Sequence, residues 1–306
     1  MPSKLKIALA GSSGLIGSTL VDHFANSGHD LTLLLRRPPP EPLPHRYLLW
    51  RPGDSMLESA ALDGHDIVIN LGGVNLAAGR WSQSRKELLR NSRIDSTQLL
   101  ANSIASLERP PQLFISASAV GIYGNRPPQE EITESTRPGE GFLADLCRDW
   151  EAACQPAVDA GIRTINLRFG VVLSTRGGAL AKLLPFFRIG LGGRSGSGRQ
   201  MMSWIALAEI RSLVDHLIKT DSLHGPVNAV SPNPISNREF TKILANLLRR
   251  PALFFQPAWL LKLLFGQMAE ETILAGARVM PEKLTNSGYQ FRTPDLREAL
   301  ESVLQE

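Results

Sequence analysis

The fold of this chain is decided by Lys6-Ile7-Ala8-Leu9-Ala10-Gly11-Ser12-Ser13-Gly14-Leu15-Ile16-Gly17, an apolar run that breaks into three glycines and continues with helical spacing. Gly11 can take the tight turn out of a strand, and Gly14 has no Cβ to hold a phosphate away from the backbone. Gly17 lets a helix lie close to the sheet. The pattern predicts a phosphate-binding turn between a strand and a helix, with an ordinary glycine-rich loop as the alternative.

The length and composition suit an α/β protein with a large core. The 306 residues exceed one average domain, and 43% of them are hydrophobic. The net charge of +4 comes from 33 Lys and Arg scattered among 29 acids, without a polybasic run. This distribution favours a small anionic ligand, and we expect no nucleic-acid partner.

The cysteines and the hydropathy pattern indicate a reducing compartment. Cys147 and Cys154 fall in one predicted helix, residues 142–160, where seven residues span roughly 10 Å and exclude a disulfide. Gly11 interrupts the first apolar run, and no apolar stretch approaches about 18 residues. We therefore expect a soluble cytoplasmic chain with no membrane partner and no metal site, whereas the oligomeric state is left open.

The second predicted strand, residues 30–35, ends in two arginines. In dinucleotide-binding folds this strand end meets the adenosine ribose, where an acid accepts the hydroxyls of NAD and an arginine accommodates the extra phosphate of NADP. Arg36 and Arg37 stand there without a neighbouring Asp or Glu. The sequence therefore favours NADP, and a solvated basic strand end is the alternative.

Strands and helices continue to alternate along the chain. Strands are predicted at residues 47–50, 65–73, 112–118 and 163–168, and helices at 83–107 and 142–160. This order predicts an α/β fold of the Rossmann type, a doubly wound parallel sheet with a smaller C-terminal substrate lobe. We expect residues 1–172 to form the NADP-binding domain and residues 173–306 the lobe, with a strand near 225–230 rejoining the sheet.

Two stretches of the second half have unusual compositions. Residues 192–200 are rich in glycine and arginine, which predicts a binding loop in which Arg194 or Arg199 holds an anionic substrate. Residues 259–265 carry a single lysine among apolar side chains. A packed helix of the lobe is favoured there over a helix lying on a membrane surface.

Several motifs resemble the extended short-chain dehydrogenase/reductase superfamily: Gly11-x-x-Gly14-x-x-Gly17, Asn70-Leu71-Gly72-Gly73, Ser116-Ala117-Ser118 before Tyr123-Gly124, and Leu167-Arg168-Phe169-Gly170. Residues 191–200, the pair Trp150-Glu151 and residues 275–289 are similar to one epimerase-family branch. That branch has a C-terminal lobe and includes bacterial proteins of unassigned activity, a human NADP-binding member, and plastid and cyanobacterial cell-division inhibitors.

The turn and this resemblance together imply which residues bind the cofactor. They are the turn residues Gly11, Ser12, Ser13, Gly14, Leu15, Ile16 and Gly17, with Arg36, Arg37, Leu71, Gly72, Arg93, Ser116 and Val171. Arg93 as an exposed helix residue and Val171 as a core residue are the alternatives.

The superfamily's chemistry uses a serine, a tyrosine and a lysine four residues after that tyrosine. Ser118 fits the serine, but the residues four positions after Tyr47, Tyr123 and Tyr289 are Arg51, Pro127 and Thr293. Tyr123 is a candidate substitute acid, although a packed aromatic is favoured. The resemblance implies an NADP-dependent oxidoreductase resembling nucleoside-diphosphate-sugar epimerases, with a non-catalytic NADP-sensing or cell-division regulator as the alternative.

Overall fold

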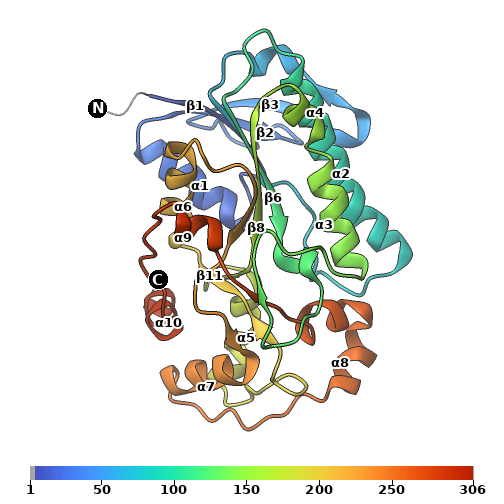
Figure 1. Cartoon of the computed structure of the whole chain (residues 1–306), viewed down its shortest axis with the longest axis vertical. Coiled ribbons are helices and arrows are strands. Elements are labelled where there is room, and N and C mark those ends of the chain that lie inside the picture. The colour runs from blue at the N-terminus through green and yellow to red at the C-terminus, as the bar shows by residue number, and fades with distance from the viewer. Residues whose placement is uncertain (1–3, 306) are drawn as a thin grey trace.

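A computed structural model describes residues 4–305 as a large sheet flanked by helices, with a smaller group of helices beyond one end of the sheet (Figure 1). The sheet has eight strands in the order β12-β8-β6-β5-β1-β2-β3-β4. Their bounds are β1 Lys6–Ala10, β2 Asp30–Leu35, β3 Arg46–Arg51, β4 Met56–Leu57, β5 Ile67–Asn70, β6 Leu113–Ala119, β8 Arg163–Phe169 and β12 Gly225–Ala229.

The pairing of these strands confirms the Rossmann-type fold. Every neighbouring pair is parallel except β3 with β4, which is antiparallel. The strand order reverses on the two sides of β1, so the carboxyl ends of β1, β2 and β5 meet at the switch point where such sheets bind ligands. β12, from the second half of the chain, pairs with β8 and lies at one edge of the sheet.

Helices cover both faces of the sheet. Their bounds are α1 Leu15–Asn26, α2 Gln83–Ala105, α3 Phe142–Ala152, α4 Gln155–Asp159, α5 Gly178–Arg188, α6 Glu209–Lys219, α7 Asn237–Leu247, α8 Ala258–Phe265, α9 Glu282–Asn286 and α10 Leu296–Gln305. Alternation along β1 shows the two layers, because Ile7 and Leu9 pack with α1 and α6 whereas Ala8 and Ala10 pack with α2 and α4.

Short strands join the sheet to the C-terminal helices. They form three pairs: β7 (Glu131–Ile132) with β14 (Arg278–Val279), β9 (Val171–Leu173) with β11 (Trp204–Ala206), and β10 (Met201–Met202) with β13 (Ile235–Ser236). A second apolar core beside β9 and β11 holds α5, α7 and α10 together, with Trp204 and Leu244 completely buried. The C-terminal part therefore has a core of its own.

One sequence-based prediction about helices is corrected. The helix predicted for residues 142–160 is two helices, α3 and α4, and Cys154 is the N-cap of the second while Cys147 lies in the first. Both cysteines are free and buried. α8 packs through one face, with Leu261 buried and Phe265 against an apolar cluster, whereas Trp259 is 67% exposed.

Candidate functional site

The turn after β1 brings two loops into contact through glycines. Gly11 has a φ of +82°, and a Cβ there would lie 2.7 Å from the carbonyl carbon of Leu71, in the loop after β5. A Cβ on Gly17 would lie 2.1 Å from the carbonyl oxygen of Gly11. Neither position has space for a side chain, so α1 begins directly against the turn and the loop after β5 lies beside it.

Gly14 lies on the open side of the same turn. It is the N-cap of α1, its N–H donates to the carbonyl of Gly11 at 3.0 Å, and no side chain caps the helix. Ser13 and Gly14 are exposed, and the nearest atom to a Cβ on Gly14 would be the oxygen of Gly11, at 3.3 Å. The first N–H groups of α1, with the helix dipole behind them, therefore face a place that an anion can reach.

The two arginines after β2 stand at the same edge of the sheet. β1 and β2 are parallel with Ala10 opposite Leu34, so Arg36 follows β2 beside the turn that follows β1. Arg36 and Arg37 are both exposed. Two exposed cations therefore follow β2 beside the open side of the turn.

Arg93 is buried, so its interpretation as an exposed helix residue is wrong. Its guanidinium donates to the carbonyl of Val74 at 2.9 Å and lies over the ring of Trp150, with Cζ 5.1 Å from the ring centroid. A Cβ on Gly73 would lie 3.2 Å from that guanidinium carbon. Burial lowers the pKa of Arg93 to about 10. The side chain of Arg93 thus holds the loop after β5 in place through its contacts with Gly73 and Val74.

Other predicted cofactor residues line or support the same region. The N–H of Leu71 donates to Ala10 at 3.0 Å, and the N–H of Gly72 donates to the side chain of Asn70 at 3.1 Å. Val171 is half-buried in β9. Ser116 is completely buried inside β6. A cofactor could therefore reach Leu71, Gly72 and Val171, whereas Ser116 lies beneath the surface.

Leu15 and the start of α5 enclose the other side of the turn. A Cβ on Gly177 would lie 3.6 Å from Leu15, and Arg176 donates to the hydroxyl of Thr19 at 2.9 Å. Lys182, one turn into α5, donates to the carbonyl of Ala77 at 2.9 Å. The segment that leads into α5 therefore lies against α1, and α5 itself contacts the loop after β5.

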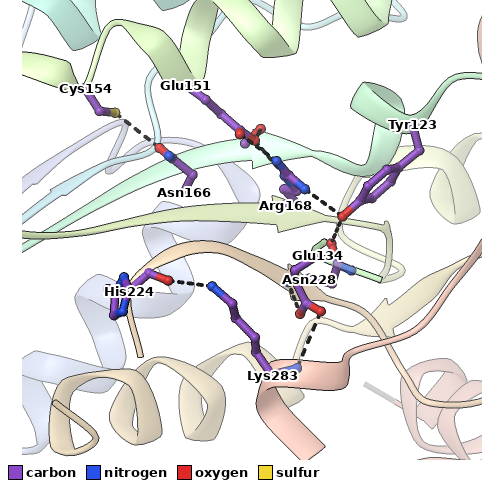
Figure 2. A network of polar contacts seen from close by, with 10 residues as sticks. Tyr123, Glu134, Glu151, Cys154, Asn166, Arg168, His224, Asn228 and Lys283 are labelled. Atoms are coloured by element: carbon purple, nitrogen blue, oxygen red, sulfur yellow. Dashed lines mark hydrogen bonds and ion pairs between the residues drawn. The ribbon is translucent and has the colours of Figure 1, made fainter. Parts of the chain in front are cut away.

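Ser118 belongs to a buried network of charged and polar side chains, which we call the polar network: Ser118, Tyr123, Glu134, Glu151, Arg168 and Asn228. Figure 2 labels all of these residues except Ser118. The hydroxyl of Ser118 donates to Glu151 at 2.6 Å. Arg168 donates twice to the same carboxylate, with both bonds at 2.8 Å. This is a bidentate ion pair in which Arg168 is 6% exposed.

Tyr123 continues the polar network toward β12. Its hydroxyl accepts from Arg168 at 2.7 Å and donates to Asn228 at 2.7 Å. Glu134 in turn accepts from the backbone N–H groups of Asn228 at 3.0 Å and Lys283 at 3.4 Å. Ser118 and Tyr123 are linked only indirectly in the polar network, through hydrogen bonds to Glu151 and Arg168.

The surroundings of Tyr123 oppose a role as proton donor. Burial raises the pKa of its hydroxyl to about 12, although the charge of Arg168 works in the other direction. The side chain is 0% exposed. Burial would by itself lower the pKa of Arg168, but the hydrogen bonds and charge of Glu151 outweigh it and raise that pKa. This geometry agrees with the packed-aromatic interpretation of Tyr123.

The arginines expected to hold a substrate lie away from the polar network. Arg194 lines a pocket of about 330 Å³ formed with α7 and residues 250–255, and neither Ser118 nor Tyr123 lines it. Arg199 is exposed on the same glycine-rich loop. The pocket that Arg194 lines is therefore separate from Ser118 and Tyr123.

Sequence reasoning assigned no role to four residues of the polar network: Glu134, Glu151, Arg168 and Asn228. Arg168 gave the clearest signal, since an arginine inside a buried apolar strand needs a carboxylate partner. Trp150-Glu151 was noticed only as part of a motif. Glu134 lies in a loop and gave no signal at all.

The described part of the chain contains neither a cluster of metal-ligating side chains nor a helix that could span a membrane. Within residues 4–305 no three His, Cys, Asp or Glu side chains gather as a metal site would require. No helix in that range has the length and apolarity needed to cross a bilayer.

Family comparisons agree with this geometry. Residues 7–225 match the family described as "NAD dependent epimerase/dehydratase family", and residues 256–303 match a "Domain of unknown function (DUF1731)". The second match covers α8, α9 and α10, the part that follows the sheet.

Similar proteins match along nearly their whole length. An epimerase family protein of Mycobacterium tuberculosis is 41% identical, over 96% of this chain and 96% of the relative. The human epimerase family protein SDR39U1 is 30% identical over 98% of this chain and 100% of the relative. Its crystal structure with NADPH superposes with a TM-score of 0.89 at 30% identity, over 99% of this chain and 100% of that one.

A nucleoside-diphosphate sugar epimerase of Corynebacterium glutamicum is similar as well, with a TM-score of 0.80 and 38% identity, over 99% of this chain and 58% of that one. Family model, relatives and solved structures agree. The chain belongs to the NAD dependent epimerase/dehydratase family, among the members whose fold matches the human protein SDR39U1.

Proposed function

We propose that this protein binds NADP(H) at the turn after β1 and uses it as an oxidoreductase or epimerase acting on a small anionic substrate. The single observation that carries the proposal is the open, uncapped start of α1 at Gly14, bordered by Arg36 and Arg37 without an acid beside them. The human relative crystallised with NADPH supports the choice of NADP over NAD.

The residues present fit a dinucleotide. The N–H groups at the start of α1 would hold the pyrophosphate, with Ser12, Ser13, Leu15 and Ile16 around it. Arg36 and Arg37 would hold the adenosine phosphate, because a guanidinium fork matches phosphate oxygens. Leu71, Gly72 and Val171 would border the rest of the cofactor, and Arg93 would keep the loop after β5 in place.

This placement of the cofactor suggests how the chain is divided into domains. We propose that residues 1–172, completed by β12, form the cofactor domain and that the remaining residues form the substrate lobe. When bound, the nicotinamide ring supplies or accepts hydride. The buried reduced thiols of Cys147 and Cys154 suit work in a reducing compartment such as the cytoplasm.

A sugar nucleotide is the substrate class that the comparisons favour. The similar protein of Corynebacterium glutamicum is described as a nucleoside-diphosphate sugar epimerase. Arg194 and Arg199 are the substrate-binding candidates, because a diphosphate needs cations and both lie on the glycine-rich loop. Ser118 would act as a positioning residue rather than a hydrogen-bond donor to the substrate, since its hydroxyl already donates a hydrogen bond to Glu151 at 2.6 Å.

Two observations about the tyrosines favour a non-catalytic function. The chain lacks a lysine four residues after any of its tyrosines, and Tyr123 is buried with a pKa raised to about 12. A general acid near neutral pKa contributes roughly 10²–10⁴-fold in rate, and Tyr123 does not meet that requirement. An NADP-sensing or cell-division regulatory protein is therefore the second candidate.

A cofactor titration tests the binding proposal. NADPH should bind at least about tenfold more tightly than NADH, because one charged hydrogen bond contributes roughly 1.5–3 kcal/mol. Arg36→Ala should remove most of that preference, and Arg148→Ala, which removes an exposed arginine of α3, should leave it unchanged. Equal affinities for the two cofactors in the unmodified protein would contradict the assignment.

A substrate screen separates the two candidates. Nucleotide sugars, aldehydes and ketones are mixed with the protein, and NADPH absorbance is followed. Turnover of about one per second or faster, in the ordinary enzyme range, would support the oxidoreductase or epimerase, and turnover well below that rate would favour the non-catalytic candidate. Faster turnover that Tyr123→Phe abolishes would show that Tyr123 donates the proton after all.

A further inference from the structure

The pocket beside Arg194 is a built feature of the C-terminal lobe. One wall is a single face of α7, with Arg238, Lys242 and Asn246 at intervals of four residues. The opposite wall is the segment 250–255, which leads from α7 toward α8 along the end of the molecule opposite β3 (Figure 1). Arg194 enters from the glycine-rich loop.

Close backbone contact fixes the two loops that form the pocket. A Cβ on Gly193 would lie 1.3 Å from the carbonyl oxygen of Phe254, so only glycine fits at that position. The N–H of Gln256 donates to Arg194 at 3.0 Å, and the N–H of Gly196 donates back to Gln256 at 2.9 Å. The guanidinium of Arg194 lies over the ring of Phe255, 4.9 Å from its centroid, and donates to the carbonyl of Ser197 at 3.0 Å.

The charge of the pocket is unbalanced. Its twelve lining residues include Arg194, Arg238, Lys242 and Arg250 and no acid. Among the ion pairs within residues 4–305, none includes any of these four. Like charges gathered in one concave surface repel each other and raise the local concentration of anions.

The pocket is separate from the cofactor site. None of its lining residues belongs to the turn after β1, to Arg36 and Arg37, or to the loop after β5. The two anion sites also differ in construction, because the turn offers backbone N–H groups whereas the pocket offers side-chain cations.

We propose that this pocket is a second anion site, which binds the phosphate or diphosphate group of a ligand other than the NADP(H) held at the turn. Four neighbouring cations favour a ligand group with more than one negative charge, and arginine forks match phosphate oxygens in geometry. Thr241 and Asn246, also on the lining face of α7, add hydrogen-bonding groups.

The rim of the pocket indicates what the phosphate is attached to. Leu253 is 86% exposed, and Phe254 and Phe255 are each about half exposed. Trp259 and Leu263 on α8, the helix that follows this segment, are exposed as well. Such a surface is costly to leave in water, so the ligand carries an apolar or aromatic group next to its phosphate. A soluble aryl or nucleoside phosphate and a phospholipid headgroup share this chemistry.

Calorimetry with inorganic pyrophosphate tests the site in protein saturated with NADPH, so that the turn is filled. Pyrophosphate should bind, and Lys242→Gln and Arg250→Gln should each weaken binding by about tenfold. Both side chains are exposed, so neither change disturbs the core. Arg297→Gln removes an exposed charge of α10 outside the pocket and should have no effect.

Two further arms identify the source of the phosphate. Phenyl phosphate represents soluble ligands, and vesicles of phosphatidylcholine with or without phosphatidic acid represent lipid. Binding to phenyl phosphate, or cosedimentation that requires phosphatidic acid, supports the site when Lys242→Gln weakens it. The proposal is overturned if no probe binds, if the two pocket variants bind all probes normally, or if NADPH displaces pyrophosphate competitively.

Discussion

The turn after β1 and the polar network are built in opposite ways. The turn takes its geometry from three glycines within seven residues, and it presents backbone N–H groups to solvent. The polar network is assembled from side chains far apart in the chain, with sequence separations of 33 from Ser118 to Glu151 and 105 from Tyr123 to Asn228. The first is open and can accept a ligand, whereas the second is closed and satisfies its own charges.

This difference explains what each region does for the protein. A buried ion pair whose hydrogen bonds are all made holds its neighbours in one arrangement, and removing one partner leaves the other charge uncompensated. An uncapped helix start costs little in water and gains free energy when an anion arrives. Changes in the polar network should therefore affect folding, and changes in the turn should affect binding.

The largest effect is expected from Arg168→Ala. It leaves the Glu151 carboxylate buried without its bidentate partner, and breaking a buried pair from one side costs about 3–5 kcal/mol of the free energy of unfolding. Urea denaturation measures this loss. Arg148→Ala, which removes an exposed arginine of α3, is the control and should change stability by less than about 0.5 kcal/mol. Equal stability of the two variants would refute the assignment of the polar network as structural.

The turn is tested by two glycine substitutions with different expected outcomes. Gly14 has an extended backbone, with φ −77° and ψ 168°, so Gly14→Val should fold normally and lose NADPH affinity by about 100-fold or more, because the side chain occupies the phosphate position. Gly17→Ala should lose stability as well, since its Cβ would lie 2.1 Å from the oxygen of Gly11. Calorimetry with NADPH and circular dichroism of both variants decide it. A folded Gly14→Val protein that still binds NADPH tightly would show that the phosphate lies elsewhere.

Tyr123→Phe separates the structural and catalytic interpretations of this tyrosine. The variant leaves Asn228 and Arg168 each without one hydrogen bond, so the free energy of unfolding should fall by about 1–3 kcal/mol. NADPH affinity should stay the same. A cofactor titration beside a thermal melt gives both readouts, and a stable variant with altered cofactor binding would place Tyr123 in the binding site instead.

The effect of alkaline pH is expected to be gradual, because it develops over several pH units. Burial raises the pKa of Tyr123, Cys147 and Cys154 to about 12, whereas in the unfolded chain the tyrosine titrates near 10 and the thiols near 9. The folded protein therefore binds more protons than the unfolded one above about pH 9, so stability falls as the pH rises, by at most about 1.4 kcal/mol per pH unit for each group. Urea midpoints between about pH 8 and about pH 10 measure the slope. Replacing both cysteines with alanine should flatten it, and an unchanged slope would mean that the thiols do not contribute.

The sequence was sufficient for the parts of the fold that depend on local pattern. Apolar runs such as residues 30–35 and the helical spacing after Gly14 predicted the strands and helices of the first half. The break between α3 and α4 was missed although Pro156 marks it, because a proline is disfavoured inside a helix and is favoured in the first turn of a new one.

The site was predictable only where it depends on the backbone. The spacing of Gly11, Gly14 and Gly17 predicts a phosphate-binding turn, and the position of Arg36 after a strand predicts a contact with the adenosine phosphate. Which carboxylate would pair with Arg168 depends on how α3 packs on β6 and β8, and that information is spread over the whole chain. The pocket beside Arg194 was hidden for the same reason, since Gly193 and Phe254 meet only in the folded molecule.

The position of β12 at the edge of the sheet has a consequence for synthesis on the ribosome. Until residues 225–229 have emerged, β8 is an unprotected edge with free backbone donors and acceptors, and Asn228 is not yet there to bond Tyr123. At about 5–20 residues per second, the nascent chain carries this edge for a time on the order of seconds. The chain therefore completes its sheet late in translation, and chaperones have a defined interval in which an exposed strand needs protection.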